Sequence, residues 1–216
     1  MRGLLDRHRE RIDGAVLPSA ERAVSLVAVT KTQSADALQE ALATGQLLFG
    51  ENKVQEAQSH WLDLKKTHPD IKLHLIGPLQ TNKVKDALAL FDCIETLDRE
   101  KLADALALEM KKQGRDVPCL VQVNTGEEDQ KAGIAPRDLK SFVAYCQAAG
   151  LTITGLMCIP PMEEPAGLHF ALLKSLADEC GLTQLSMGMT GDFEKAIAAG
   201  ATHVRIGTAL FGERKN

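Results

Sequence analysis

Short runs of apolar residues alternate with longer amphipathic segments along almost the whole chain of 216 residues. The short runs have the length and β-branched content of buried strands, whereas the longer segments carry apolar residues at helical spacing. Leu139, Phe142, Val143 and Cys146, for example, stand at positions i, i+3, i+4 and i+7, which predicts a helix with one buried face. The chain is therefore predicted to repeat strand–helix units.

Eight strands are predicted, after an N-terminal helix: 25–31, 47–50, 72–77, 93–96, 119–124, 152–159, 184–188 and 203–207. Strands joined by helices pair in parallel through right-handed crossovers. Eight such units match an α/β fold of the closed (β/α)8 TIM barrel type, and a doubly wound open sheet is the alternative. Because no linker or change of composition interrupts the pattern, residues 1–216 are expected to form a single domain.

Local signals predict where several helices begin and end. Ser34 is expected to cap a helix that stops at Gly45, and Asp98 a helix that is closed by Gly114. These expectations can be compared with the structure residue by residue.

Composition and charge exclude several classes of protein. The chain is 44% hydrophobic and 25% charged with a net charge of -4, and it has no basic stripe, so nucleic acid is not an expected partner. No apolar run approaches the ~20 residues that span a bilayer, and the charged N-terminus does not resemble a signal peptide, so we expect a cytoplasmic protein without membrane contact. The cysteines form no CxxC pair and the histidines are scattered, so no metal site is predicted.

Two stretches near the C-terminus have the composition of phosphate-binding loops. Residues 186–190 (Ser-Met-Gly-Met-Thr) end the seventh predicted strand, and residues 205–208 (Arg-Ile-Gly-Thr) end the eighth. Small or hydroxylated residues followed by a helical pattern offer unpaired backbone N–H groups and the positive end of a helix dipole. In a barrel, phosphates bind after these two strands.

Lys31 ends the first predicted strand, which neighbours the eighth strand once a barrel closes. A lysine amine in a desolvated pocket loses its proton more readily and can form a Schiff base. Lys31 beside a phosphate cradle therefore indicates a phosphorylated aldehyde held as a Schiff base. The alternative is a solvated lysine at the start of a loop.

Four further residues are candidates for the same site. Arg205 lies on an apolar strand and needs a partner, which is either a pyridine nitrogen of the cofactor or a strand-end carboxylate. Because arginine only donates hydrogen bonds, a pyridine nitrogen facing it would stay unprotonated and the ring would be a weaker electron sink. Asn52 either binds the ligand or belongs to an ordinary turn. His74 is expected to be a core residue, and Cys158 is reactive only if its pKa is depressed.

Six stretches together resemble the pyridoxal-5′-phosphate homeostasis protein family: AVTKTQ, FGENKVQEA, HLIGPLQTNK, VNTGEEDQKAGI, GLMCIPP and, at 186–214, SMGMTGDFEKAIAAGATHVRIGTALFGER. They follow the family's order over nearly the whole chain. The resemblance implies a single (β/α)8 barrel like the N-terminal domain of alanine racemases, with pyridoxal 5′-phosphate bound to Lys31. It implies that Ser186 and the backbone at Gly207 and Thr208 hold the phosphate, that Arg205 faces the pyridine nitrogen, and that Asn52 lies near the cofactor.

The family's role implies a carrier and buffer of pyridoxal phosphate that maintains vitamin B6 and amino-acid balance without catalysis. Other B6 vitamers and apo-enzymes that accept the cofactor are the implied partners, and a monomer is expected. Two residues depart from the family pattern: Lys53 stands where many members have tyrosine, and Thr190 where many have serine. Thr190 keeps a hydroxyl, so phosphate binding should survive.

Two other functions stay open. One is a pyridoxal-phosphate-dependent enzyme such as an amino-acid racemase, which needs an acid–base group opposite the lysine. The only tyrosine, Tyr145, lies in a helical pattern, and this weighs against that alternative. The other is a barrel that binds an ordinary sugar or nucleotide phosphate, with Lys31 as an ion-pair partner. A second vitamer site near Lys83 and Lys85 is a further possibility.

Overall fold

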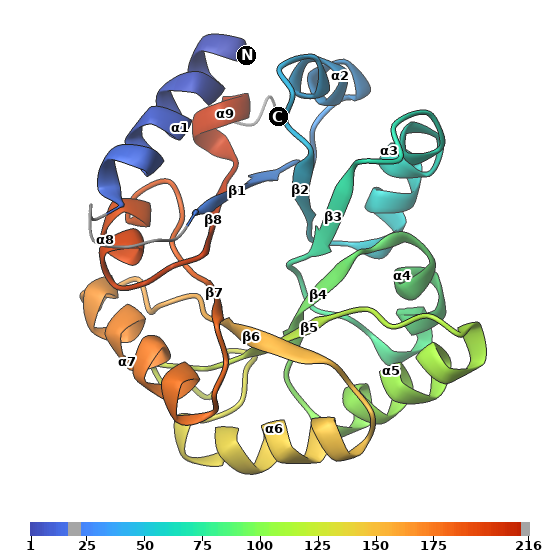
Figure 1. Cartoon of the computed structure of the whole chain (residues 1–216), viewed down its shortest axis with the longest axis vertical. Helices are drawn as coiled ribbons and strands as arrows, with labels where there is room; N and C mark the ends of the chain where they lie inside the picture. The colour runs from blue at the N-terminus through green and yellow to red at the C-terminus, as the bar shows by residue number, and fades with distance from the viewer. Residues whose placement is uncertain (17–22, 213–216) are drawn as a thin grey trace.

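Eight parallel strands close into a barrel in the order β1 to β8 (Figure 1). The structure is a computed structural model that describes residues 1–16 and 23–212, so the end of the motif at Arg214 lies outside the described residues. The barrel prediction is confirmed, and the open doubly wound sheet is wrong. The strands are β1 Ser25–Val29, β2 Leu48–Glu51, β3 Lys72–Leu75, β4 Cys93–Leu97, β5 Cys119–Gln122, β6 Ile153–Met157, β7 Gln184–Ser186 and β8 His203–Ile206.

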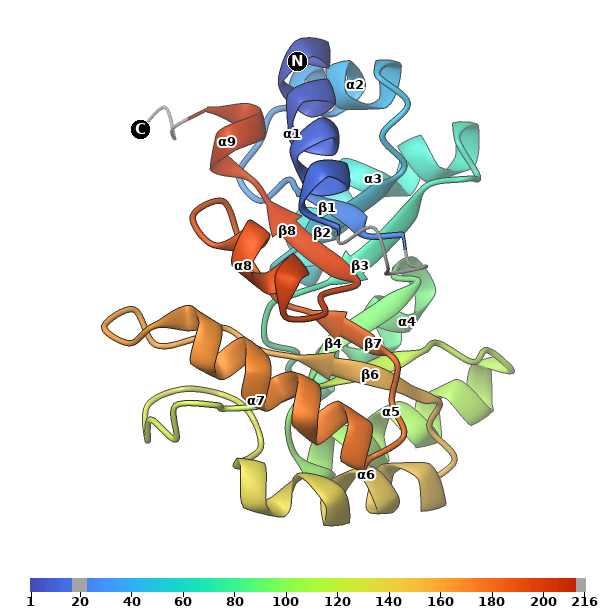
Figure 2. The same ribbon diagram turned by 60° about the vertical axis from the view of Figure 1, so that its left-hand side comes forward.

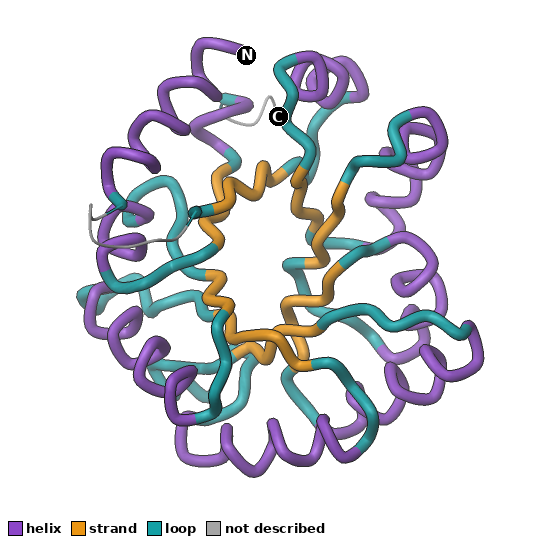
Figure 3. The backbone as a smooth tube through the Cα atoms, viewed as in Figure 1, coloured by secondary structure: helices purple, strands orange, loops and turns teal. Residues whose placement is uncertain are grey.

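Helices surround the ring of strands on its outside (Figure 3). The predicted N-terminal helix is present as α1, which packs against α8 and α9 (Figure 2). None of the described helices is long and apolar enough to cross a membrane. The helices are α1 Arg2–Ala15, α2 Ala35–Ala43, α3 Val54–Thr67, α4 Val84–Leu90, α5 Glu100–Gln113, α6 Leu139–Ala148, α7 Ala166–Glu179, α8 Phe193–Ala198 and α9 Thr208–Phe211, with short 3₁₀ turns at Thr81–Lys83 and Pro136–Asp138.

The barrel closes where β1 pairs with β8. Ser25 lies opposite His203, and Ala28 lies opposite Ile206. Several strands end before the predicted boundary: β1 stops at Val29 and β8 at Ile206, because the chain turns into the following loop. Lys31 and Gly207 therefore lie in loops just beyond two neighbouring strands.

Most of the predicted helix signals are confirmed. Ser34 caps α2, where its side chain accepts a hydrogen bond from the Ala37 amide, and Gly114 closes α5 in the left-handed conformation. The expected cap at Asp98 is wrong. Arg99 occupies the N-cap position of α5 without a side-chain hydrogen bond, and Asp98 instead forms an ion pair with Arg99.

The loop after β3 passes very close to the loop after β2. A Cβ atom built on Gly77 would lie 2.2 Å from the backbone oxygen of Asn52, a distance that no real contact allows. Only glycine permits this approach, so Gly77 fixes where Asn52 sits at the end of the barrel.

The variant Gly77→Ala is expected to lower the free energy of unfolding by about 3 kcal/mol, because the added methyl group forces the two backbones apart. Chemical denaturation measures the change. Gly167→Ala is the matched control, since a Cβ on Gly167 meets nothing within 4 Å, and it should leave stability unchanged or slightly raised. Equal effects of the two substitutions would contradict the close approach.

Candidate functional site at the carboxyl ends of the strands

A cavity of about 300 Å³ lies at the carboxyl ends of the strands. Its wall includes Lys31 after β1, Asn52 after β2 and Arg205 on β8, together with Gly207 and Thr208 at the start of α9. The structure thus brings five of the residues predicted from the sequence to one cavity. Its size suits a small organic ligand.

Lys31 is half-buried at the cavity wall, between Thr30 and Thr32. Among the described residues, it makes no hydrogen bond or ion pair. Its amine is therefore not committed to a carboxylate of residues 1–16 or 23–212. This disfavours the interpretation of Lys31 as an ion-pair partner within the chain and leaves the amine available to a ligand.

Two loops contribute residues to the wall of the cavity. Thr208 begins α9 behind Gly207, and Thr190 and Gly191 belong to the loop between β7 and α8. The first amides of a helix have no partner within it and can bind an anion. The sequence pattern located both loops: Thr190 belongs to the stretch 186–190 and Thr208 to the stretch 205–208, whereas Gly191 lies just beyond the first of them.

The shape of the β7–α8 loop depends on Gly188. Its φ is 91°, and a Cβ there would lie 2.6 Å from the Cβ of Ala196. The side chain of Asp192 then accepts a 2.6 Å hydrogen bond from the Met189 amide, which holds the loop in its turn. A glycine and a carboxylate thus set the part of the loop that reaches the cavity.

Ser186 lies beneath the cavity and is not part of its wall. It is fully buried, its hydroxyl donates to Glu95 Oε2 at 2.6 Å, and it accepts a 2.7 Å hydrogen bond from Nη1 of Arg205. In this arrangement Ser186 supports Arg205 from below. The predicted direct contact between Ser186 and a phosphate stays a prediction.

Arg205 is 4% exposed and is held by two hydrogen bonds, to Ser186 Oγ and to the Cys158 backbone oxygen at 2.8 Å. Its Nη1 also lies 4.0 Å from Glu95 Oε2, so a carboxylate partner exists. This partner is on β4, across the barrel, and not at the end of a neighbouring strand as the sequence alternative supposed. Because a guanidinium has five N–H donors, donors remain for a ligand in the cavity that Arg205 lines.

Glu95 was missed by the sequence analysis, although a carboxylate within the apolar run Cys-Ile-Glu-Thr-Leu signals a buried ion. Burial favours its neutral form, but the hydrogen bond and charge of His74, the charge of Arg205 and the Ser186 hydroxyl outweigh burial and lower its pKa to about 2. His74 Nδ1 lies 2.6 Å from Glu95 Oε1, so His74 has a hydrogen-bond partner, although its side chain is half-buried and not fully in the core.

This polar network spans the barrel. His74 and the nearby His203 reach a hollow at the amino ends of the strands, whereas Arg205 reaches the cavity at the carboxyl ends. Burial lowers the pKa of His203, which favours its neutral form. Among the described residues, Glu95 is the carboxylate that lies within 4.0 Å of the Arg205 guanidinium.

The sequence left open whether Cys158 is reactive. Burial raises the pKa of Cys158 to about 12, so this thiol is not a nucleophile near neutral pH.

A second cavity of about 390 Å³ shares Asn52 with the first and is lined by Lys53 and Lys83, whereas Lys85 is exposed on α4.

The fold and the cavity define a (β/α)8 barrel whose ligand site presents a primary amine, a guanidinium and two loops with amide groups. Residues 11–215 match the family model of the alanine racemase N-terminal domain. The pyridoxal phosphate homeostasis protein of Vibrio cholerae is 41% identical over 206 residues, which cover 90% of this chain and 87% of that protein. The chain therefore belongs to the alanine racemase N-terminal domain family and, within it, to the pyridoxal phosphate homeostasis proteins.

Solved structures agree with this assignment. The structure of PipY from Synechococcus elongatus with pyridoxal phosphate bound is 36% identical and has a TM-score of 0.81, with coverage of 94% of this chain and 99% of that chain. An alanine racemase of Clostridium difficile matches at 13% identity with a TM-score of 0.71, over 97% of this chain and 57% of that chain. The racemase likeness shows the fold alone.

The variant Glu95→Gln is expected to lower the free energy of unfolding at pH 7 by about 3 kcal/mol, because it leaves the buried Arg205 charge without its counter-ion. A carboxyl group whose pKa is lowered by folding contributes stability above its unfolded pKa and loses it as the pH falls through the folded value. The deficit should therefore shrink as the pH falls from 4.5 to about 2. Urea denaturation across this pH range measures the difference in free energy of unfolding, with the exposed Glu40→Gln as the control. A difference that does not change with pH would contradict the pairing of Glu95 with Arg205.

Proposed function

We propose that this protein binds pyridoxal phosphate as a Schiff base on Lys31 and carries and buffers it without catalysing a reaction of its own. The observation that carries this proposal is the single cavity shared by Lys31, Arg205 and the two amide loops. Homologous proteins named for pyridoxal phosphate homeostasis, and PipY with this cofactor bound, support it.

The cavity fits the groups of this cofactor. Pyridoxal phosphate supplies an aldehyde that condenses with a primary amine and releases water. Lys31 provides that amine, and the amides at Gly207, Thr208 and Thr190 would hold the phosphate at the start of α9. Asn52, whose side-chain oxygen is buried without a hydrogen-bond partner, would take a polar ring substituent.

Arg205 would donate a hydrogen bond to the ring nitrogen, as proposed from the sequence. Since Ser186 and Glu95 hold its side chain from below, the guanidinium reaches the cavity in a fixed orientation. An arginine at this position keeps the ring nitrogen unprotonated and the ring a weak electron sink. Binding is then favoured over chemistry at an amino-acid Cα.

The part of the cavity wall that the described residues form also lacks a second acid–base group. Of the described residues that line it, only Lys31 and Arg205 are ionisable, and arginine does not give up its proton. Tyr145 is half-buried on α6, where its hydroxyl donates to Asp104 at 2.6 Å at the surface. Two-base racemisation has no second base here, which supports the carrier over the racemase alternative.

A carrier also explains why Lys31 is accessible at the rim of the barrel. A free amine of another protein could reach the bound aldehyde carbon and replace Lys31, so we propose apo-enzymes as acceptors and other B6 vitamers as competing ligands. Because the cavity needs both β1 and β8, we further propose that residues 1–216 act as one binding unit.

Borohydride reduction of the protein incubated with pyridoxal phosphate is expected to fix one pyridoxyl group on Lys31, since the imine becomes a stable amine. Peptide mass mapping locates the group. In Lys31→Ala the adduct should be lost while the circular dichroism spectrum is unchanged, because Lys31 makes no contact that the fold needs.

Lys53→Ala and Lys83→Ala are the matched controls, since both lysines line the adjoining cavity, and they should keep the adduct. Retention of the adduct in Lys31→Ala, or its loss in a control alone, would refute the assignment of Lys31.

Exchange of the Cα hydrogen of L-alanine tests the absence of catalysis. A positioned acid–base pair contributes about 10²–10⁴-fold, so the loaded protein is expected to stay within about tenfold of free pyridoxal phosphate. Proton NMR in D₂O follows the exchange, and Tyr145→Phe should not alter it. Exchange a thousandfold above the free cofactor would establish the racemase alternative instead.

A further inference from the structure

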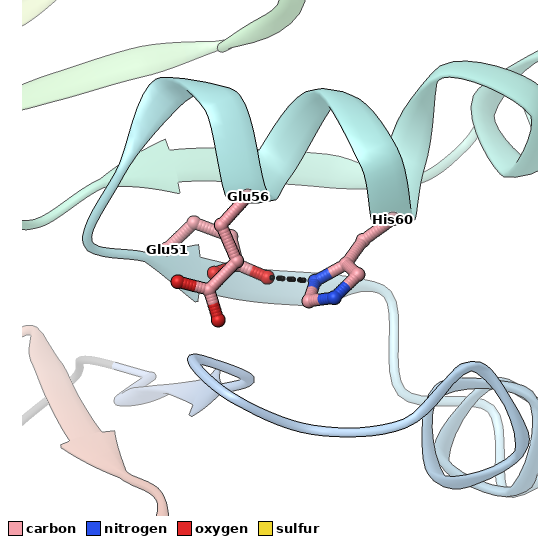
Figure 4. A group of neighbouring side chains, drawn as sticks. All are labelled: Glu51, Glu56 and His60. Atoms are coloured by element: carbon pink, nitrogen blue, oxygen red, sulfur yellow. Dashed lines mark hydrogen bonds and ion pairs between the residues drawn. The ribbon is translucent and has the colours of Figure 1, made fainter.

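Among the described residues, one group of side chains is arranged as metal ligands: Glu51, Glu56 and His60 (Figure 4). One ligand atom from each lies within 4.8 Å of the other two. Glu51 ends β2, and Glu56 and His60 lie four residues apart on α3, so they share one face of that helix. None of the three lines the cofactor cavity.

The two carboxylate oxygens of the buried Glu51 differ in their hydrogen bonding. It is fully buried, and its Oε1 accepts hydrogen bonds from the Thr30 hydroxyl at 2.7 Å and the Trp61 indole at 2.9 Å, with His60 Nδ1 at 3.1 Å. Its Oε2 is buried without any hydrogen-bond partner. A buried carboxylate oxygen without a donor is costly, and here a second carboxylate, that of Glu56, lies beside it.

A cation would account both for the unpartnered oxygen of Glu51 and for the second carboxylate beside it. Two carboxylates lie together here, and the contact of His60 reaches only the Oε1 atom of Glu51. A cation bound to Glu51 would occupy its unpartnered oxygen and relieve the repulsion between the two acids. Hydrogen bonding alone leaves Glu51 Oε2 unsatisfied.

We propose that Glu51, Glu56 and His60 form a binding site for a divalent transition-metal ion such as Zn²⁺ or Co²⁺. An imidazole with two carboxylates favours these ions, whereas Ca²⁺ and Mg²⁺ prefer ligand sets made only of oxygen. Water completes the coordination. The site is separate from the cofactor cavity and adjoins it through the Lys31 loop.

Both neighbours of Lys31 are held by this cluster. Glu51 accepts a hydrogen bond from the Thr30 hydroxyl, and Glu56 accepts one from the backbone amide of Thr32. Thr32 has a φ of 62°, a left-handed conformation that non-glycine residues adopt at a cost. A metal ion that fixes the two carboxylates would fix the turn that presents Lys31, so the site would regulate cofactor retention. This regulatory part rests on the proposed function.

Trp61 makes the site measurable. It is the only tryptophan in the chain, and its indole donates to Glu51, so its emission reports on this carboxylate. Titration of the tag-free apo protein with Co²⁺ is expected to quench Trp61 with one saturable site. The absorption spectrum should show weak d–d bands and no thiolate charge-transfer band, because the proposed ligands contain no sulfur.

Glu56→Gln and His60→Gln are each expected to weaken Co²⁺ binding at least tenfold. Asp63→Asn and His68→Gln are the matched controls, since they remove an exposed acid and an exposed histidine at the end of the same helix, and they should bind like the parent. Absence of saturable quenching, a thiolate band, or equal binding by His60→Gln would overturn the proposal.

Separate measurements test the metal site and the carrier function, so that one proposal can be refuted without the other. Lys31→Ala should bind Co²⁺ like the parent chain, because the metal ligands do not include Lys31, and borohydride trapping of pyridoxal phosphate needs no metal. Regulation predicts that saturating Zn²⁺ changes the rate of cofactor release at least about fivefold in the parent and not in His60→Gln. An unchanged release rate would overturn the regulatory role alone.

Discussion

The pairing of β1 with β8 is the constraint on which the candidate site depends. It joins strands from opposite ends of the sequence, Ser25–Val29 and His203–Ile206, and no local interaction could bring them together. Once the ring closes, Lys31 stands beside the start of α9 and the loop after β7. Loss of this pairing would separate the amine from the amide loops, so closure of the barrel and assembly of the cavity are one event.

Closure also creates a buried core that cannot be entirely apolar. Arg205 projects from β8 into the barrel, and the low dielectric there makes an unpaired guanidinium very costly. Glu95 balances it from β4, with Ser186 between them and His74 on the other oxygen of Glu95. Replacing the whole set by apolar residues would keep a stable barrel. We therefore interpret the network as a means of aiming Arg205 at the cavity, with stability as its secondary effect.

The features that could be predicted from the sequence are those that follow from the periodicity of apolar residues and from the order of the strands. The alternation of strands and helices predicted the barrel, and strand order then predicted that Lys31 and Gly207 are neighbours, as the structure shows. Contacts across the barrel interior were not predictable. Ser186 was expected to hold the phosphate, and that contact stays a prediction; its hydrogen bonds to Glu95 and Arg205, which the sequence did not predict, form because strand β7 ends at this residue with its side chain turned inward. Glu95 was missed because its partners come from distant parts of the chain, so no spacing identifies them. The group at Glu51 is local in sequence, and the four-residue spacing of Glu56 and His60 could have signalled it, but the approach of Glu51 from β2 could not be read from spacing.

The position of Lys31 supports reversible binding over permanent attachment. Its side chain is half-buried and has no hydrogen bond or ion pair with the residues that the structure describes, whereas the residues on either side are held by the carboxylates of β2 and α3. The backbone is thus fixed while the amine can change partners. An enzyme that performs chemistry on a bound substrate needs further groups around the lysine, and this cavity offers a donor-only arginine, amides and apolar surface. On the proposed function, this site would hold an aldehyde, activate it weakly and leave its lysine exchangeable, and these properties suit storage and transfer.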